Sequence, residues 1–161
     1  MVGPAEFLAA QEGPLYRFLR RFAANAEDAR DAMQETFRLA LENWDAVRQA
    51  GARRAWLYRI GYRVALRLPR APMAAPPEPP TPEPSPETAL LQEERLRQLA
   101  VALASLPPDL RAVLVLREMQ ELSYEEIAIA LEVPSGTIAS RLSRARALLR
   151  AKLEGTTCST H

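Results

Sequence analysis

Hydroxyl and guanidinium side chains are concentrated in the segment 135–144, where together they could bind the phosphates and base edges of nucleic acid. The set consists of Ser135, Thr137, Ser140, Arg141 and Arg144. Such donors near the start of a helix are typical of recognition helices, which meet base edges and phosphates in a major groove. The same residue types also occur on the solvated face of any amphipathic helix. Their meaning therefore depends on the elements that present them.

The apolar residues that follow predict a helix that places these donors on one face. They recur three or four positions apart and form a single stripe: Ile138, Leu142, Ala145, Leu149 and Leu153. Ser135, after Val133 and Pro134, is the expected N-cap, and Gly155 is the expected C-terminal stop. The donors lie outside the apolar stripe, as a reading helix requires.

Two further helices are expected immediately before this one. Pro107 and Pro108 open a helix that runs to about Met119, because proline is tolerated in a first turn. Ser123 and Glu126 have the spacing of a capping box at the start of a second, short helix. Residues 106–152 thus have the pattern of a helix-turn-helix, and DNA binding is the first hypothesis.

A second set of candidate nucleic-acid ligands lies in a helix expected over about residues 52–68. Arg59, Arg63 and Arg67 step by four along one face, with Tyr58 and Tyr62 further round. Guanidinium groups beside aromatic rings suit a nucleic-acid backbone and unstacked bases. An apolar stripe is expected to pack inward, and it comprises Trp56, Ile60, Val64 and Leu68, with Leu57 and Gly61 beside them.

Polar side chains also cluster on the helix that precedes it. Asn25 is the expected N-cap of a helix that reaches Trp44, after a first helix from Pro14 to Ala24. Its expected apolar face comprises Met33, Phe37, Ala40, Leu41 and Trp44, and the opposite face carries Asp31, Gln34, Glu35 and Arg38. Taken alone, a charged face of this kind is most simply a solvated one.

Proline divides the chain into two parts. Nine prolines lie between residues 69 and 86, so this segment cannot form a helix or a central strand. We expect an all-α protein with a helical domain over 1–68, an extended, acidic linker over 69–88, a helix-turn-helix domain over 89–155 and a disordered tail over 156–161. At about 3.1 Å per residue, an extended linker would span on the order of 50 Å.

The composition excludes several classes of function. The chain has 161 residues, one cysteine (Cys158) and one histidine (His161), which leaves no disulfide framework and no ordinary metal site. There is no phosphate-binding loop and no nucleophile paired with a base, so we expect no enzyme, cofactor or small-molecule substrate. No apolar run is long enough to span a membrane, and a cytoplasmic protein is expected. Net charge is +1, but residues 133–161 alone carry four Arg and one Lys against one acid.

Both halves of the sequence resemble one family, the extracytoplasmic-function group of bacterial sigma factors. Residues 26–37 (AEDARDAMQETF) are similar to the region 2.2 signature, residues 55–60 (AWLYRI) to the following region 2 helix, and residues 106–150 to region 4. The sequence departs from the usual pattern at Arg63 and Arg67, where Asn and Asp are common, at Glu132, where glycine is common, and at Ala139, where lysine is common.

The resemblance implies binding to core RNA polymerase and promoter-specific initiation, in which the polymerase performs the chemistry. It assigns Asp31, Gln34, Glu35 and Arg38 to the β′ clamp helices. It assigns Tyr58, Arg59, Tyr62, Arg63 and Arg67 to the minus-10 element, and Ser135, Thr137, Ser140, Arg141 and Arg144 to the minus-35 element. It also implies contact with the β flap and an anti-sigma factor. The alternative is a stand-alone helix-turn-helix regulator, for which the 31–38 cluster and the linker would have no purpose.

Overall fold

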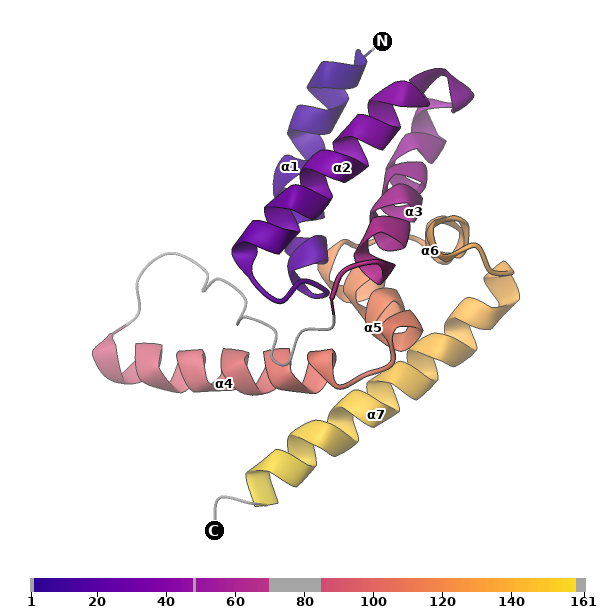
Figure 1. Cartoon of the computed structure of the whole chain (residues 1–161). Coiled ribbons are helices and arrows are strands. Elements are labelled where there is room, and N and C mark those ends of the chain that lie inside the picture. Colours follow the sequence, from indigo (N-terminus) through magenta and orange to yellow (C-terminus); the bar gives the residue numbers. More distant parts are fainter. Residues whose placement is uncertain (1, 48, 70–84, 159–161) are drawn as a thin grey trace.

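The computed structural model describes residues 2–47, 49–69 and 85–158, and every long element of these residues is a helix (Figure 1). The helices are α1 (Pro4–Arg20), α2 (Ala26–Glu42), α3 (Arg53–Leu66), α4 (Pro86–Ala104), α5 (Pro108–Leu114), α6 (Tyr124–Leu131) and α7 (Ile138–Cys158). The expected all-α class is confirmed. Most of the expected linker, residues 70–84, lies outside the described residues, as does the end of the expected tail.

Helices α1, α2 and α3 form the N-terminal bundle, and its caps are local. Asn25 accepts a hydrogen bond from the Asp28 amide at 2.8 Å, as expected for an N-cap. The prediction that Pro14 opens the first helix is wrong, because α1 begins at Pro4 and contains Pro14 in its interior. An interior proline costs about 3 kcal/mol. Burial of Leu8 before it and Phe18 after it, on one continuous core face, offsets that cost.

The buried face of α3 only partly matches the face that was expected to pack inward: Leu57, Gly61 and Val64 are buried as expected. The buried residues are Ala55, Leu57, Tyr58, Gly61, Val64 and Ala65, whereas Trp56, Ile60 and Leu68 are only half-buried. The reason is that α3 packs against α1 and α2 on one side and α6 on the other. Gly61 permits the close approach, since a Cβ there would lie 3.1 Å from Leu15 Cδ1. The predicted burial of Leu41 is also wrong, because Leu41 is 52% exposed.

The C-terminal domain contains the expected helix-turn-helix. The capping box is confirmed: the Glu126 amide donates to Ser123 Oγ at 3.1 Å, and the Ser123 amide donates to Glu126 Oε1 at 3.0 Å. Ser135, however, makes no capping bond, because residues Ser135–Thr137 form a 3-10 turn that follows Pro134. Helix α4 begins at Pro86, capped by Ser85, inside the range expected for the linker. Helix α7 continues past the expected stop at Gly155.

The two domains pack directly against each other, and α6 lies beside α3 (Figure 1). Arg111 of α5 reaches across the junction and donates to the Arg21 carbonyl at 3.1 Å. Its guanidinium also donates to the carbonyls of Leu103, Ala104 and Leu106, at 2.9, 2.8 and 3.0 Å. One arginine therefore fixes the turn between α4 and α5 and joins it to the end of α1.

Candidate nucleic-acid and polymerase interfaces

The expected reading residues lie at the start of α7 and in the turn before it. Ile138, Leu142 and Ala145 are fully buried, so the apolar stripe anchors this helix as predicted. Ser135, Ser140 and Arg144 are exposed, and Thr137 and Arg141 are half-buried. Thr137 Oγ1 donates to the Pro134 carbonyl at 2.8 Å, and Ser140 Oγ donates to the Thr137 carbonyl at 2.9 Å. Each hydroxyl retains acceptor capacity for a further donor.

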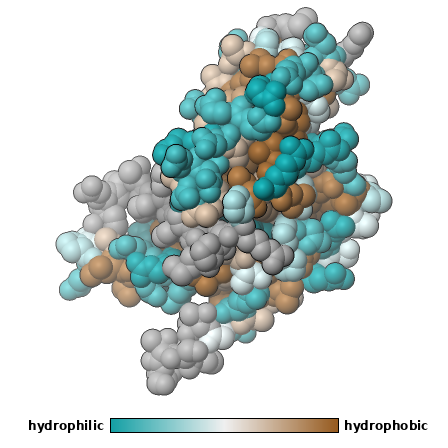
Figure 2. Space-filling model, viewed as in Figure 1, coloured by the Kyte–Doolittle hydropathy of each residue, from teal (hydrophilic) through white to brown (hydrophobic). Residues whose placement is uncertain are grey.

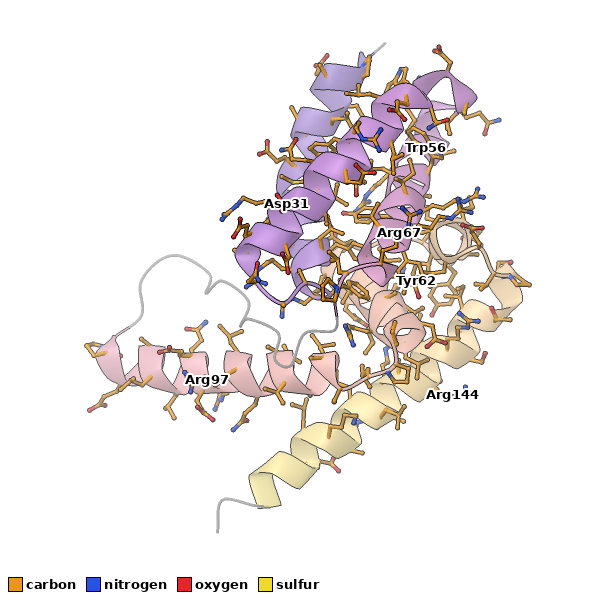
Figure 3. The ribbon with its side chains drawn as sticks, viewed as in Figure 1. Asp31, Trp56, Tyr62, Arg67, Arg97 and Arg144 are labelled. Atoms are coloured by element: carbon orange, nitrogen blue, oxygen red, sulfur yellow. The ribbon has the colours of Figure 1, made fainter. Side chains whose placement is uncertain are left out.

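Arg59 and Arg63 of α3 and Arg67, which caps its C-terminal end, line a hollow between α2 and α3. The hollow has a volume of about 370 Å³ and is lined by Leu39, Asn43, Ala46, Trp56, Arg59, Ile60, Arg63, Val64 and Arg67. Figure 3 labels Trp56 on α3 and Arg67 at the C-terminal end of this helix. Trp56 and Ile60 pack against the core, as expected, and they also form part of the apolar lining of this hollow. Arginine spacing alone indicated the cationic wall but gave no sign of the apolar surface beside it.

The two tyrosines of α3 do not share the open surface of the arginines. Tyr58 is fully buried, and its hydroxyl donates to Gln120 Oε1 at 2.8 Å. Burial raises the pKa of Tyr58 to about 12, an effect that Arg54 and Arg17 partly offset. Tyr62 is half-buried, and its ring stacks edge-on against Phe22 with centroids 6.0 Å apart. In this arrangement of the domains Tyr58 is inaccessible to nucleic acid, contrary to the expectation from its place on the helix.

The polar face of α2 is exposed and internally paired. Arg38 bridges two acids, with Nη2 2.6 Å from Glu35 Oε1 and Nη1 2.6 Å from Glu42 Oε1. The hydrogen bond from Arg38 holds the pKa of Glu35 below its usual value. Asp31 and Gln34 are exposed on the same helix, and Figure 2 shows hydrophilic side chains over α2. All four expected residues therefore lie on one accessible surface. Glu42, which pairs with Arg38, lies on it too, and the sequence pattern did not indicate its part.

The described residues contain no group of three His, Cys, Asp or Glu side chains arranged to hold a metal ion. Over the same residues, no helix is long and apolar enough to cross a membrane. The distinctive surfaces are thus the donor cluster of α7, the arginine-lined hollow of α3 and the charged face of α2.

Comparison with known proteins gives these surfaces a context. The Sigma-70 region 2 family matches residues 8–71, and the Sigma-70, region 4 family matches residues 96–149. The chain is 35% identical over 141 residues to the RNA polymerase sigma-H factor of Pseudomonas aeruginosa, covering 78% of this chain and 73% of the relative. It is 36% identical over 143 residues to the ECF RNA polymerase sigma-E factor of Escherichia coli, covering 79% and 74%.

Two solved structures have a similar fold. One is CnrH in complex with the cytosolic domain of CnrY, with a TM-score of 0.71, 28% identity, and coverage of 94% of this chain and 88% of that one. The other is the sigma factor RpoE in complex with the anti-sigma factor NepR from Bartonella quintana. That match has a TM-score of 0.70 and 22% identity and covers 93% of this chain and 96% of that one.

The fold, with a region 2 bundle and a region 4 helix-turn-helix, defines a sigma-70 family protein. Within that family the chain belongs to the extracytoplasmic-function group of RNA polymerase sigma factors. Sigma factors are transcription initiation factors that act with core RNA polymerase. The alternative of a stand-alone regulator is not favoured, because the region 2 match accounts for the N-terminal half that such a regulator leaves unexplained.

Proposed function

We propose that the two domains of this sigma factor divide promoter recognition between them. The α3 hollow, with Arg59, Arg63 and Arg67, binds the minus-10 element, and the start of α7 reads the minus-35 element. The hollow is the observation that carries this proposal, because its guanidinium groups suit the phosphates of single-stranded DNA and its apolar surface suits the bases. The arginines bind its phosphates, and Trp56 and Ile60 offer apolar contact to an unstacked base.

The minus-35 assignment rests on the arrangement of α7. The donors Ser135, Thr137, Ser140, Arg141 and Arg144 gather near its first turns, where the backbone amides and the helix dipole also favour phosphate. The buried stripe on the opposite face fixes the orientation of the helix. Arginine reads guanine through two parallel hydrogen bonds, and we assign that role to Arg141 or Arg144.

Two further surfaces are proposed for core polymerase. The α2 face of Asp31, Gln34, Glu35 and Arg38 contacts the β′ clamp helices, since its acids and bases are exposed and held in place by ion pairs. The β flap binds the apolar groove near the end of α7, which Leu149 and Leu153 line with the stems of Arg146 and Arg150. An apolar partner segment would cover these leucines and leave the charged ends in solvent.

An anti-sigma factor is the proposed regulatory partner, and a bacterial cytoplasm the proposed location. Support comes from the likeness to CnrH, which was solved in complex with the cytosolic domain of CnrY and whose match covers both domains of this chain. Such a partner would hold the two domains together or cover their polymerase-facing surfaces.

In-vitro transcription with bacterial core polymerase on a pool of randomised promoters tests the proposed function. We expect promoter-specific transcripts only when the chain is added, and selected templates that share two elements separated by a fixed spacer. Replacing Arg63 and Arg67 by alanine should reduce open-complex formation, whereas replacing the exposed Arg30 of α2 should not. Transcription no higher than that of core polymerase alone would overturn the proposal, and tight operator binding without polymerase would indicate a stand-alone regulator.

A further inference from the structure

Gln120 is the central polar contact between the two domains. It is 5% exposed, and its side chain accepts from the Tyr58 hydroxyl at 2.8 Å and donates to the Pro14 carbonyl at 3.0 Å. Its backbone carbonyl accepts from Arg54. A π turn over Val115–Met119 directs Gln120 into this position. Three contacts to α1 and α3 therefore converge on one residue of the C-terminal domain.

Glu132 makes a second contact between the domains, and it does so from an unfavourable backbone conformation. It follows α6 with φ 58° and ψ 46°, in the left-handed region that glycine adopts most readily. Its carboxylate pairs with Arg59 Nε at 3.1 Å and with Arg63 Nη2. The hydrogen bond from Arg63 is the main reason that the pKa of Glu132 is lowered. Glycine would suit the backbone better, but it would leave both arginines without this carboxylate.

The two arginines that Glu132 engages line the hollow proposed for minus-10 DNA. A carboxylate and a phosphate present similar pairs of anionic oxygens to a guanidinium group. Arg59 and Arg63 therefore cannot give Glu132 and a DNA phosphate the same hydrogen bonds at once.

We propose that Glu132 is a built-in phosphate mimic that occupies Arg59 and Arg63 while the domains are packed together, so that the free sigma factor binds minus-10 DNA weakly. The inference rests on the proposed function of the α3 hollow. A DNA phosphate can displace Glu132 from the two arginines, because exposed ion pairs contribute little stability. Separation of the domains on core polymerase would release the arginines. If only a fraction of the free chain is open, its apparent affinity for DNA is the intrinsic affinity multiplied by that fraction.

The variant Glu132→Gly tests this proposal without endangering the fold, because glycine adopts the required backbone conformation readily. The measurement is fluorescence anisotropy of a labelled single-stranded minus-10 oligonucleotide, bound by the full chain without polymerase. We expect Glu132→Gly to tighten binding about threefold to tenfold. The matched control is Glu125→Gln, which removes the same charge from α6 at a residue that forms no ion pair with the described part of the chain.

Arg63→Ala in the Glu132→Gly background should abolish the gain, because Arg63 is the group released. An equal gain in the Glu125→Gln control would overturn the proposal, since net charge alone would then explain it. No gain in Glu132→Gly would also overturn it. Transcription by the wild-type chain with core polymerase is measured in parallel. If the wild-type chain initiates normally but Glu132→Gly does not bind the oligonucleotide more tightly, only the phosphate mimic is refuted. If the wild-type chain fails to initiate, the proposed function itself is refuted.

Discussion

The hydroxyl of Tyr58 and the side-chain carbonyl of Gln120 lie 2.8 Å apart, although 62 residues separate them in the sequence. Both groups are buried, and the bond joins the region 2 bundle to the region 4 domain. Buried polar groups that lose a partner are destabilising, so this bond makes the packed arrangement of the domains specific.

Tyr58→Phe should therefore lower the free energy of unfolding by about 1–3 kcal/mol, because Gln120 Oε1 keeps its burial and loses its donor. Urea denaturation measures this, and Tyr16→Phe, at a half-buried tyrosine of α1, is the control. In a double-mutant cycle with Gln120→Leu, we expect a coupling energy of about 1 kcal/mol. Additive effects would show that the hydrogen bond does not stabilise the junction.

The burial of Tyr58 predicts a loss of stability at high pH. Burial raises the pKa of Tyr58 to about 12, above the ordinary value of 10 that applies in the unfolded chain. A raised pKa means that the folded state favours the neutral phenol. The resulting stability is complete below the unfolded pKa and disappears as pH rises through the folded one. A pH titration followed by tyrosinate absorbance should show one ionisation near pH 12 that is missing in Tyr58→Phe. A titration unchanged by that variant would contradict the assignment of this ionisation to Tyr58.

Arg111→Lys should be strongly destabilising even though the charge is kept. The guanidinium group donates to four backbone carbonyls, of Leu103, Ala104, Leu106 and Arg21. A single ammonium group cannot reach all four, and we expect a loss of about 2–3 kcal/mol. Thermal unfolding measures it. Arg97→Lys, at an exposed ion pair of α4, is the matched control and should change stability by less than about 0.5 kcal/mol.

Glu35→Arg should weaken binding to core polymerase at least about tenfold if α2 contacts the clamp, because it reverses a charge within the contact and removes the acid that holds Arg38 in place. The fold should survive, since the Glu35–Arg38 pair is exposed and stabilises little. Affinity for core polymerase is measured by competition with a labelled sigma factor. Glu12→Arg, the same charge change at an exposed site on α1, serves as the control. Equal affinities for the wild type and Glu35→Arg would remove α2 from the proposed interface.

Arg141→Ala should reduce minus-35 binding by the holoenzyme by about 1–3 kcal/mol if Arg141 reads a base. Discrimination between promoter variants at one position should fall with it. A uniform loss across all variants would instead indicate a phosphate contact. Arg95→Ala, at an exposed arginine of α4, should leave both affinity and discrimination unchanged.

Local signals in the sequence predicted the elements well. Asn25 caps one helix, and Ser123 with Glu126 caps another. Each capping hydrogen bond joins residues only three positions apart, so it can be predicted from the local sequence. In the apolar stripe of α7, Ile138, Leu142 and Ala145 are buried as expected, whereas Leu149 and Leu153 are half-buried. Pro14 shows the limit of such signals, since tertiary burial on both sides of it carries α1 through a residue that normally ends or opens a helix.

Sequence alone determined the class of this protein: helices, two domains around a proline-rich segment, and donors on helical faces that match the sigma-70 regions. Only the tertiary structure decided which of those faces are open. Tyr58 is buried because α3 is covered by α6 as well as by its own bundle, and Trp56 lines the hollow between α2 and α3. Glu132 meets Arg59 and Arg63 across the same junction. These contacts join residues far apart in the chain, and helical periodicity carries no information about partners at that distance.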